Sequence, residues 1–166
     1  SDQIRNLVNE FSAFARLPAA NPEPCQLTEI VEVAVALYRE ARPDILFEIR
    51  SEPDIPQLYL DKQQMKRAVI NLIDNAIAAT DGGGTIGVAM KFDPILKIVR
   101  LEVSDTGTGI SPEDKIRLFE PYFSTKKTGM GLGLSIVSTI VEDHNGFIRV
   151  QDNQPRGTKF IVELPA

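Results

Sequence analysis

The sequence has one cysteine and one histidine, and it lacks any long hydrophobic run. A single Cys25 cannot form an internal disulfide, which fits a reducing cytosolic environment. A membrane-spanning helix needs about 20 consecutive apolar residues, and no segment approaches that length. The net charge of −5 argues against nucleic acid as the main partner, because such binding usually needs a basic face. We therefore expect a cytoplasmic domain that does not bind nucleic acid.

Two common phosphate-binding signatures are also absent. The chain contains no Gly-Lys-Ser/Thr, which excludes a Walker motif, and no strand is expected directly before its glycine-rich stretch, which excludes a Rossmann fingerprint. There is no internal repeat and no low-complexity segment. The 166 residues are 43% hydrophobic and 25% charged, so a real core is possible and disorder is not expected. These values predict one domain of ordinary size, with a short appendage at most.

Residues 1–17 carry the pattern of a helix with a narrow apolar seam. Apolar side chains recur there at alternating spacings of three and four, which is typical of a helix that packs against another helix. These side chains are Ile4, Leu7, Phe11 and Phe14. Three prolines in residues 18–25 then stop the helix and favour a stiff linker. We expect a fragment that begins inside this helix, with the main domain over residues 26–166.

The main domain shows alternating helical and strand patterns. Helices are expected over residues 28–41, 61–80 and 132–144, with a short additional helix from Ser111-Pro112-Glu113-Asp114. Strands are expected over residues 45–50, 57–60, 85–92, 97–104, 147–151 and 157–164. Helices beside such strands predict a two-layer α/β sandwich, with a mixed, mostly antiparallel sheet covered by three helices.

Two of these helices have a clear apolar side. For residues 28–41 the expected buried side chains are Ile30, Val31, Ala34, Val35, Leu37 and Tyr38. For residues 61–80 they are Met65, Ala68, Val69, Leu72, Ile73 and Ala76. Asp61 is expected to cap the second helix, with Gln64 in the reciprocal position of a capping box. Asp81-Gly82-Gly83-Gly84 is expected to end it.

Asn71 and Asn75 lie four residues apart, on one face of the predicted helix beside its apolar stripe. A side-chain amide there can offer an oxygen to Mg²⁺ or to a phosphate-bound water. Mg²⁺ often takes only one or two protein oxygens and keeps water and nucleotide phosphates for the rest. The alternative is a pair of polar residues on a solvated helix face.

Asp105 stands on the apolar side of its predicted strand. It shares the parity of Val99, Leu101 and Val103, and a buried carboxylate must find a donor. The exocyclic amine of adenine is a suitable donor, whereas the alternative is an aspartate that caps the following turn. The glycines of the Asp105-Thr106-Gly107-Thr108-Gly109 stretch let the backbone turn tightly beside a flat ring.

The stretch Gly129-Met130-Gly131-Leu132-Gly133-Leu134 opens a predicted helix. Free backbone amides at a helix N-terminus attract phosphates, and glycines leave these amides accessible. A flexible glycine loop is the alternative. Near the end of the chain, Gly157-Thr158 starts a strand, and Thr158 can hydrogen-bond a purine beside Asp105, although threonine is also a common strand residue.

Residues 118–127 carry three aromatic side chains, Phe119, Tyr122 and Phe123, followed by two lysines, Lys126 and Lys127. This composition suits a lid that packs on the domain and directs a cation toward phosphates. The alternative is simple hydrophobic packing with solvated lysines.

In this order, the stretches resemble the ATP-binding catalytic domain of sensor histidine kinases, within the gyrase–chaperone–histidine kinase–MutL superfamily. The resemblance covers residues 26–166 and implies a Bergerat-type ATP-binding fold. Residues 7–18 look like the end of the second helix of the dimerisation and phosphotransfer hairpin. Together with Phe123-Ser124-Thr125-Lys126, that helix end looks most like nitrogen-regulation sensor kinases.

The resemblance implies ATP or ADP and Mg²⁺ as ligands, with a role for each motif residue. Asp105 would accept a hydrogen bond from the adenine amine, and Asn75 would bind Mg²⁺. Asn71 would assist at the phosphates, and Lys126 would contact the terminal phosphates. The implied catalytic residues are therefore Asn71, Asn75 and Lys126. The other nucleotide-binding residues would be Gly107, Gly109, Ile110, Phe119, Phe123, Thr125, Gly129, Gly131, Leu132, Gly133 and Thr158.

The implied reaction is transfer of the γ-phosphate to a histidine on the protein's own hairpin, for relay to the receiver domain of a response regulator. The full-length protein would be a homodimer and could be anchored in the inner membrane. The helix that carries the phosphoacceptor in the family is not in this chain. The only histidine, His144, lies at the end of a predicted helix and is expected to interact with that helix C-terminus instead.

Two other functions stay open, an ATPase-type conformational switch and a nucleotide-binding regulatory module without transfer activity. Hydrolases of the superfamily place a glutamate four residues before the Mg²⁺-binding asparagine. Asn71 stands at that position here, and an amide is no general base, which favours the kinase.

Overall fold

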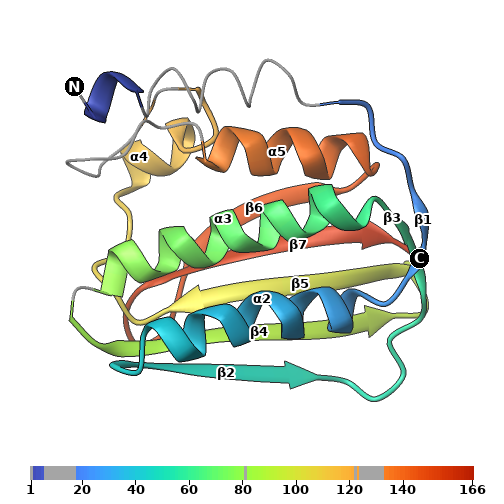
Figure 1. The fold of residues 1–166 in the computed structure, drawn as a ribbon, viewed down its shortest axis with the longest axis horizontal. Helices are drawn as coiled ribbons and strands as arrows, with labels where there is room; N and C mark the ends of the chain where they lie inside the picture. The colour runs from blue at the N-terminus through green and yellow to red at the C-terminus, as the bar shows by residue number, and fades with distance from the viewer. Residues whose placement is uncertain (1, 6–17, 81, 122, 124–132) are drawn as a thin grey trace.

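The computed structural model describes residues 2–5, 18–80, 82–121, 123 and 133–166 of the chain. Of the helix predicted over residues 1–17, residues 2–5 are helical, and residues 1 and 6–17 lie outside the described residues. Figure 1 shows a layer of helices across one face of a sheet, as predicted for a two-layer sandwich. The covering helices are α2 (Leu27–Ala41), α3 (Lys62–Thr80) and α5 (Gly133–Asp143).

The main sheet has five strands in the order β2-β4-β5-β7-β6. Their bounds are β2 (Ile45–Ser51), β4 (Gly84–Asp93), β5 (Ile98–Asp105), β6 (Phe147–Asp152) and β7 (Thr158–Pro165). Strands β2 and β4 are parallel and every other neighbouring pair is antiparallel. The parallel pair follows from the connection through α3, because parallel strands need a crossover that brings the chain back to the starting edge. The prediction of a mixed, mostly antiparallel sheet is confirmed.

A second, two-stranded sheet joins β1 (Glu23–Cys25) to β3 (Leu58–Leu60). Residues 18–25 were predicted to form a stiff linker, and the short strand β1 lies within them. Pro24 pairs with Tyr59 at the edge of this small sheet, a position where proline is tolerated because its missing N–H need not enter a ladder. The segment that leads into the domain is thereby fixed to it.

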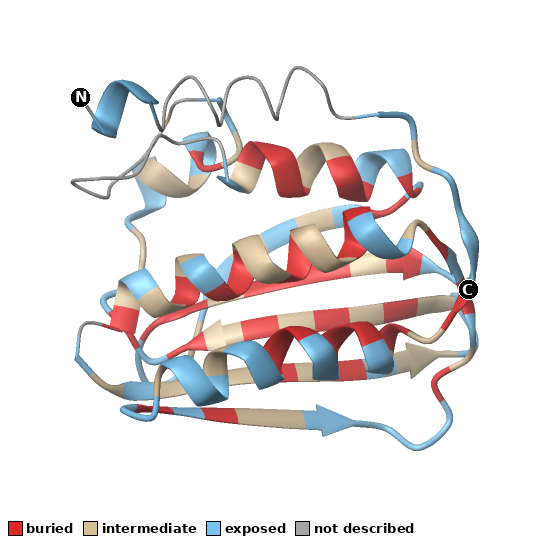
Figure 2. Ribbon diagram, in the orientation of Figure 1, coloured by how far each residue is buried: buried red, intermediate tan, exposed pale blue. Residues whose placement is uncertain are grey.

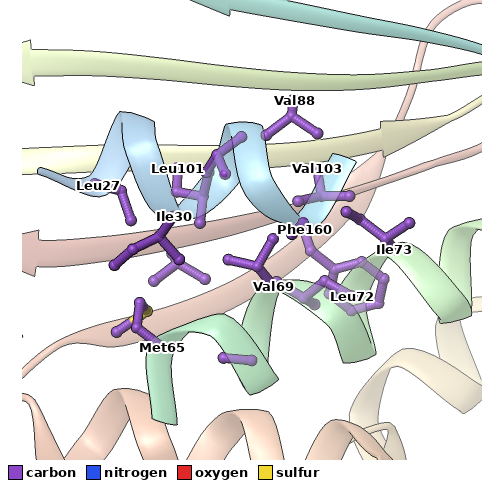
Figure 3. Packing of buried hydrophobic residues seen from close by; sticks show 14 of the residues in the cluster. Leu27, Ile30, Met65, Val69, Leu72, Ile73, Val88, Leu101, Val103 and Phe160 are labelled. Carbon is purple, nitrogen blue, oxygen red and sulfur yellow. The ribbon is translucent and has the colours of Figure 1, made fainter. Parts of the chain in front are cut away.

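The hydrophobic core lies between the helices and the sheet (Figures 2 and 3). On β5 the residues Val99, Leu101, Val103 and Asp105 are buried and the residues between them are only half-buried, which confirms the predicted parity. The whole predicted stripe of α3 is buried as well.

In α2 the prediction for Leu37 is wrong, because its side chain is 55% exposed. Leu27, Val31 and Ala34 follow the spacing of one helix face, and Tyr38 rather than Leu37 continues it. Tyr38 is half-buried, and its hydroxyl donates to Asp74 Oδ1 at 2.6 Å, which joins α2 to α3.

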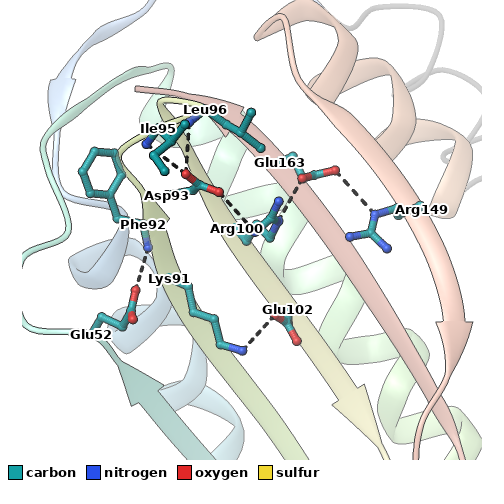
Figure 4. A network of polar contacts seen from close by, with 10 residues as sticks. All are labelled: Glu52, Lys91, Phe92, Asp93, Ile95, Leu96, Arg100, Glu102, Arg149 and Glu163. Atoms are coloured by element: carbon teal, nitrogen blue, oxygen red, sulfur yellow. Dashed lines mark hydrogen bonds and ion pairs between the residues drawn. The ribbon is translucent and has the colours of Figure 1, made fainter.

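The opposite face of the sheet carries charged side chains in rows across the strands (Figure 4). Arg100 lies 2.9 Å from Glu163, which also pairs with Arg149 at 3.4 Å. Such partly exposed pairs contribute little stability each, but they balance the charges of this face. No helix within the described ranges combines the length and apolar character needed to cross a membrane.

Candidate functional site

Asp105 ends β5 and is the centre of the site. Its side chain is only 2% exposed, and its Oδ1 accepts hydrogen bonds from the backbone N–H of Gly107 at 2.9 Å and of Thr158 at 3.3 Å. Burial raises the pKa of the Asp105 carboxyl above its usual range, and these two hydrogen bonds offset the effect only in part. Among the described residues no donor reaches Oδ2. The carboxylate therefore keeps one acceptor for a ligand.

The turn after Asp105 packs directly on the end of α3. A Cβ on Gly107 would lie 2.0 Å from the carbonyl oxygen of Ala79, so only glycine fits there. The N–H of Thr108 donates to the same carbonyl at 3.2 Å. On the other side of the turn, Thr106 Oγ1 accepts from the N–H of Thr85 at 3.1 Å. The turn is thus held by α3 and by β4.

The loop between β6 and β7 holds the turn from a third direction. Asn153 Nδ2 donates to the backbone carbonyl of Asp105 at 2.8 Å, and Arg156 Nε donates to that of Gly107 at 2.8 Å. Gly157 has a φ of +108°, and a Cβ on it would lie 2.0 Å from the Asp105 carbonyl oxygen. Sequence reasoning missed Asn153 and Arg156, whose only signal was their place just before the Gly-Thr pair.

Asn71 and Asn75 both lie half-buried on α3, one turn apart, as predicted. Asn71 Nδ2 donates to the carbonyl of Gly133 at 3.3 Å, which brings the last glycine of the glycine-rich stretch next to α3. Within the described part of the chain, the Asn75 amide has no hydrogen-bond partner. Its oxygen is therefore available to a ligand. A free amide oxygen together with the open acceptor of Asp105 fits the chemistry of Mg²⁺ and of a purine amine.

Phe119 and Phe123 follow the short helix α4 (Pro112–Arg117). Ser111 caps this helix, as predicted, by accepting from the N–H of Asp114 at 3.2 Å. Phe119 meets Phe160 of β7 edge-to-face, with ring centroids 6.3 Å apart. The guanidinium of Arg117 lies 4.8 Å from the ring centroid of Phe123. The first aromatic residue of the predicted lid thus contacts the core.

The remaining site predictions fall into two groups. Ile110 is half-buried against the core, Thr158 is buried at the start of β7, and Gly109 has a φ of +78°. The following predicted residues lie outside the described residues: Thr125, Lys126, Lys127, Gly129, Gly131 and Leu132.

His144 lies at the end of α5, away from the predicted phosphate path. Its Nδ1 lies 2.7 Å from the carbonyl oxygen of Ile140 in its own helix, as predicted. The Nε2 accepts the backbone N–H of Asp61 at 3.0 Å, a contact that sequence reasoning missed. The capping box is consequently incomplete. Gln64 N–H donates to Asp61 Oδ1 at 3.1 Å, but the Gln64 side chain donates to the carbonyl of Pro18 at 2.8 Å instead of closing the box.

Comparison with known proteins adds an independent finding. The family described as histidine kinase-, DNA gyrase B- and HSP90-like ATPase matches residues 60–166. The chain is 38% identical, over 99% of its length, to the signal transduction histidine-protein kinase/phosphatase MprB of Mycolicibacterium paratuberculosis. It is 33% identical, over 97% of its length, to the nitrogen regulation protein NtrY of Azorhizobium caulinodans. It spans 33% of the first relative and 21% of the second.

Solved structures show the same fold. The mycobacterial sensor histidine kinase MprB superposes with a TM-score of 0.77 and 36% identity, covering 87% of this chain and 97% of that one. Histidine kinase ThkA in complex with response regulator protein TrrA superposes with a TM-score of 0.84 and 28% identity, covering 99% of this chain and 47% of that one. The predicted sandwich is thus the fold of histidine kinase catalytic domains.

Proposed function

The chain belongs to the family of histidine kinase-, DNA gyrase B- and HSP90-like ATPases, and we propose that it is the ATP-binding catalytic domain of a two-component sensor kinase. In this proposal the domain binds Mg-ATP and positions its γ-phosphate for transfer to a histidine on the protein's own dimerisation and phosphotransfer hairpin. Residues 1–17 are then the end of that hairpin, residues 18–25 the connection, and residues 26–166 the catalytic domain.

The observation that carries the proposal is the buried carboxylate of Asp105. Two backbone N–H groups fix its Oδ1, and its Oδ2 is left as an acceptor at the end of a core strand. A carboxylate oxygen with no hydrogen bond from the described residues can accept one from a ligand, and the exocyclic amine of adenine is a matching donor. In the same proposal Thr158, which is buried and donates its N–H to Asp105 Oδ1, completes purine recognition.

The α3 asparagines serve the phosphate side of the proposed site. Asn75 offers its amide oxygen to Mg²⁺, and Asn71 holds the first turn of α5 through Gly133. Mg²⁺ supplies charge neutralisation at the phosphates when it is bound. By family resemblance, Lys126, Thr125 and the glycine-rich stretch complete the phosphate path.

The position of Asn71 supports transfer over hydrolysis. An imidazole nitrogen is nucleophilic in its neutral form, so phosphoryl transfer to histidine needs positioning and charge neutralisation more than a strong base. Hydrolysis needs a group that activates water, and the Asn71 amide, already donating to Gly133, cannot do so.

The partners proposed for the full-length protein are a second copy of itself and the receiver domain of a response regulator. The relatives named as kinases and the solved complex of ThkA with a response regulator support these partners. A cytoplasmic location of this domain, in a parent protein anchored in the inner membrane, is part of the same proposal.

The test supplies the hairpin with its histidine in trans, together with Mg-ATP, and measures acid-labile phosphate on it. Wild type is expected to label the hairpin, and Asn75→Ala is expected to abolish the label while circular dichroism stays unchanged. Asn21→Ala, an exposed asparagine outside the site, is the matched control. Labelling that Asn75→Ala leaves intact would refute the assignment. Binding of ATP without any labelling would favour a regulatory module.

A further inference from the structure

We propose that Asn153 and Arg156 are positioning residues of the purine pocket. Both lie in the loop between β6 and β7, and we infer that they hold the Asp105–Gly107 turn so that the Asp105 carboxylate faces the purine. The inference rests on the proposed function and extends its site to a loop that no motif marked.

Asn153 joins the loop to the residue that recognises the purine. Its side-chain Nδ2 donates to the backbone carbonyl of Asp105 at 2.8 Å in a partly buried position. Its own N–H donates to the carbonyl of Gly157 at 3.0 Å, which closes the loop into a turn. Asn153 therefore fixes both the shape of the loop and the distance between the loop and the Asp105 backbone.

Arg156 reaches the other end of the same turn. Its Nε donates to the carbonyl of Gly107 at 2.8 Å, and the N–H of Gly107 in turn donates to Asp105 Oδ1 at 2.9 Å. The Gly107 peptide groups are thus fixed between the arginine and the carboxylate. A change in the arginine contact is transmitted to the donor that orients Asp105.

The rest of the loop leaves Asp105 no room to shift. The Gly157 backbone approaches so closely that a Cβ there would lie 2.0 Å from the Asp105 carbonyl oxygen. The next residue, Thr158, donates its N–H to Asp105 Oδ1 at 3.3 Å. Both donors to Oδ1 therefore depend on the placement of this loop, directly through Thr158 and through Arg156 at Gly107. The function of the loop is then to set the direction of the carboxylate, beyond adding stability.

The test compares ATP with purine riboside triphosphate, which lacks the exocyclic amine, by calorimetric titration. Asn153→Asp keeps the side-chain shape but replaces the donor with an oxygen that faces the Asp105 carbonyl. We expect it, and Arg156→Ala more weakly, to lower ATP affinity about tenfold, the effect of one lost hydrogen bond. Affinity for the analogue is expected to change less than about twofold. Gln151→Ala, an exposed β6 residue, is the matched control.

A second readout uses the nucleotide-free protein. Amide hydrogen exchange at Gly107 and Thr158 is expected to become faster in Asn153→Asp and to stay unchanged in Gln151→Ala. In the titrations, the double variant Asn153→Asp/Asp105→Asn is expected to lose little more ATP affinity than Asp105→Asn alone, because both act through one carboxylate.

The outcomes separate this inference from the proposed function. Equal losses of affinity for both nucleotides in Asn153→Asp, or an unchanged ATP affinity in this variant, would overturn the positioning role. The purine pocket itself would still stand if wild type binds ATP more tightly than the analogue. Wild type that binds neither nucleotide would overturn the proposed function, and the inference with it.

Discussion

The side-chain amide of Asn71 donates to the carbonyl oxygen of Gly133 at 3.3 Å, and this contact joins α3 to the first turn of α5. The superfamily's hydrolases are similar to one another in having a glutamate where Asn71 stands. A carboxylate at this point would face a carbonyl oxygen, so the local geometry suits an amide and disfavours a base.

We predict negligible steady-state ATP hydrolysis by this domain, because no general base stands at the position of Asn71. The measurement is phosphate release in the presence of Mg²⁺, compared with the transfer to the hairpin in trans. Sustained release that Asn75→Ala abolishes would contradict the kinase proposal, since the site itself would then hydrolyse ATP.

We predict that Asp105→Asn does not destabilise the nucleotide-free protein at neutral pH. An asparagine Oδ1 can still accept from Gly107 and Thr158, and the variant no longer buries a charge. Chemical denaturation is the measurement. A fall in the free energy of unfolding near that expected for two lost hydrogen bonds would show that the charge itself is required for folding.

The same residue predicts a pH dependence. Burial raises the folded-state pKa of Asp105 above the value of about 3.9 expected in the unfolded chain. The folded protein then binds the proton more tightly than the unfolded chain does. The free energy of unfolding of wild type, relative to that of Asp105→Asn, therefore rises as the pH falls through the folded-state pKa. It is constant below the unfolded-state pKa of about 3.9. Unfolding free energies of both proteins across this range check the sign. A difference that changes in the opposite direction would mean that the carboxylate is stabilised when charged.

We predict that Gly157→Ala lowers the free energy of unfolding by about 1–3 kcal/mol or more, from the strained φ and the clash with the Asp105 carbonyl. Gly133→Ala is the control, because a Cβ there meets nothing within 4 Å. Urea denaturation of both variants is the measurement. Similar stabilities for the two would show that the loop can move away from Asp105.

His144→Ala is expected to lower the free energy of unfolding by about 1–3 kcal/mol, because the partly buried N–H of Asp61 loses its acceptor. Phosphate transfer to the hairpin in trans should be unchanged. Asp143→Ala, an exposed neighbour, controls for position in the helix. Loss of transfer in well-folded His144→Ala would point to a part in the reaction.

The sequence predicted the helices and strands well because their apolar periodicities are strong and local. The parity of Asp105 followed from the same alternation, and its burial is confirmed. The strand that contains Pro24 could not be predicted in this way. Proline suggests a linker, and Pro24 belongs to a strand only through its pairing with Tyr59, which is distant in the sequence. The parallel pairing of β2 with β4 is long-range in the same way.

Within the site, the missed contacts are those between residues far apart in the chain. His144 reaches Asp61 across 83 residues, and Asn153 reaches Asp105 across 48 residues. No local pattern marks either pair. Gln64 is the opposite case. The local sequence predicts that its side chain closes a capping box, but this side chain donates to the carbonyl of Pro18, which is distant in the sequence.

Recognition of ATP by Asp105 can be measured by calorimetric titration of wild type and Asp105→Asn with a non-hydrolysable ATP analogue, with and without Mg²⁺. We expect Mg²⁺-sensitive binding to wild type that Asp105→Asn weakens by about tenfold to a hundredfold, the effect of a lost hydrogen bond to a charged acceptor. Equal affinity of the two proteins, or no binding by well-folded wild type, would contradict the proposed ATP site.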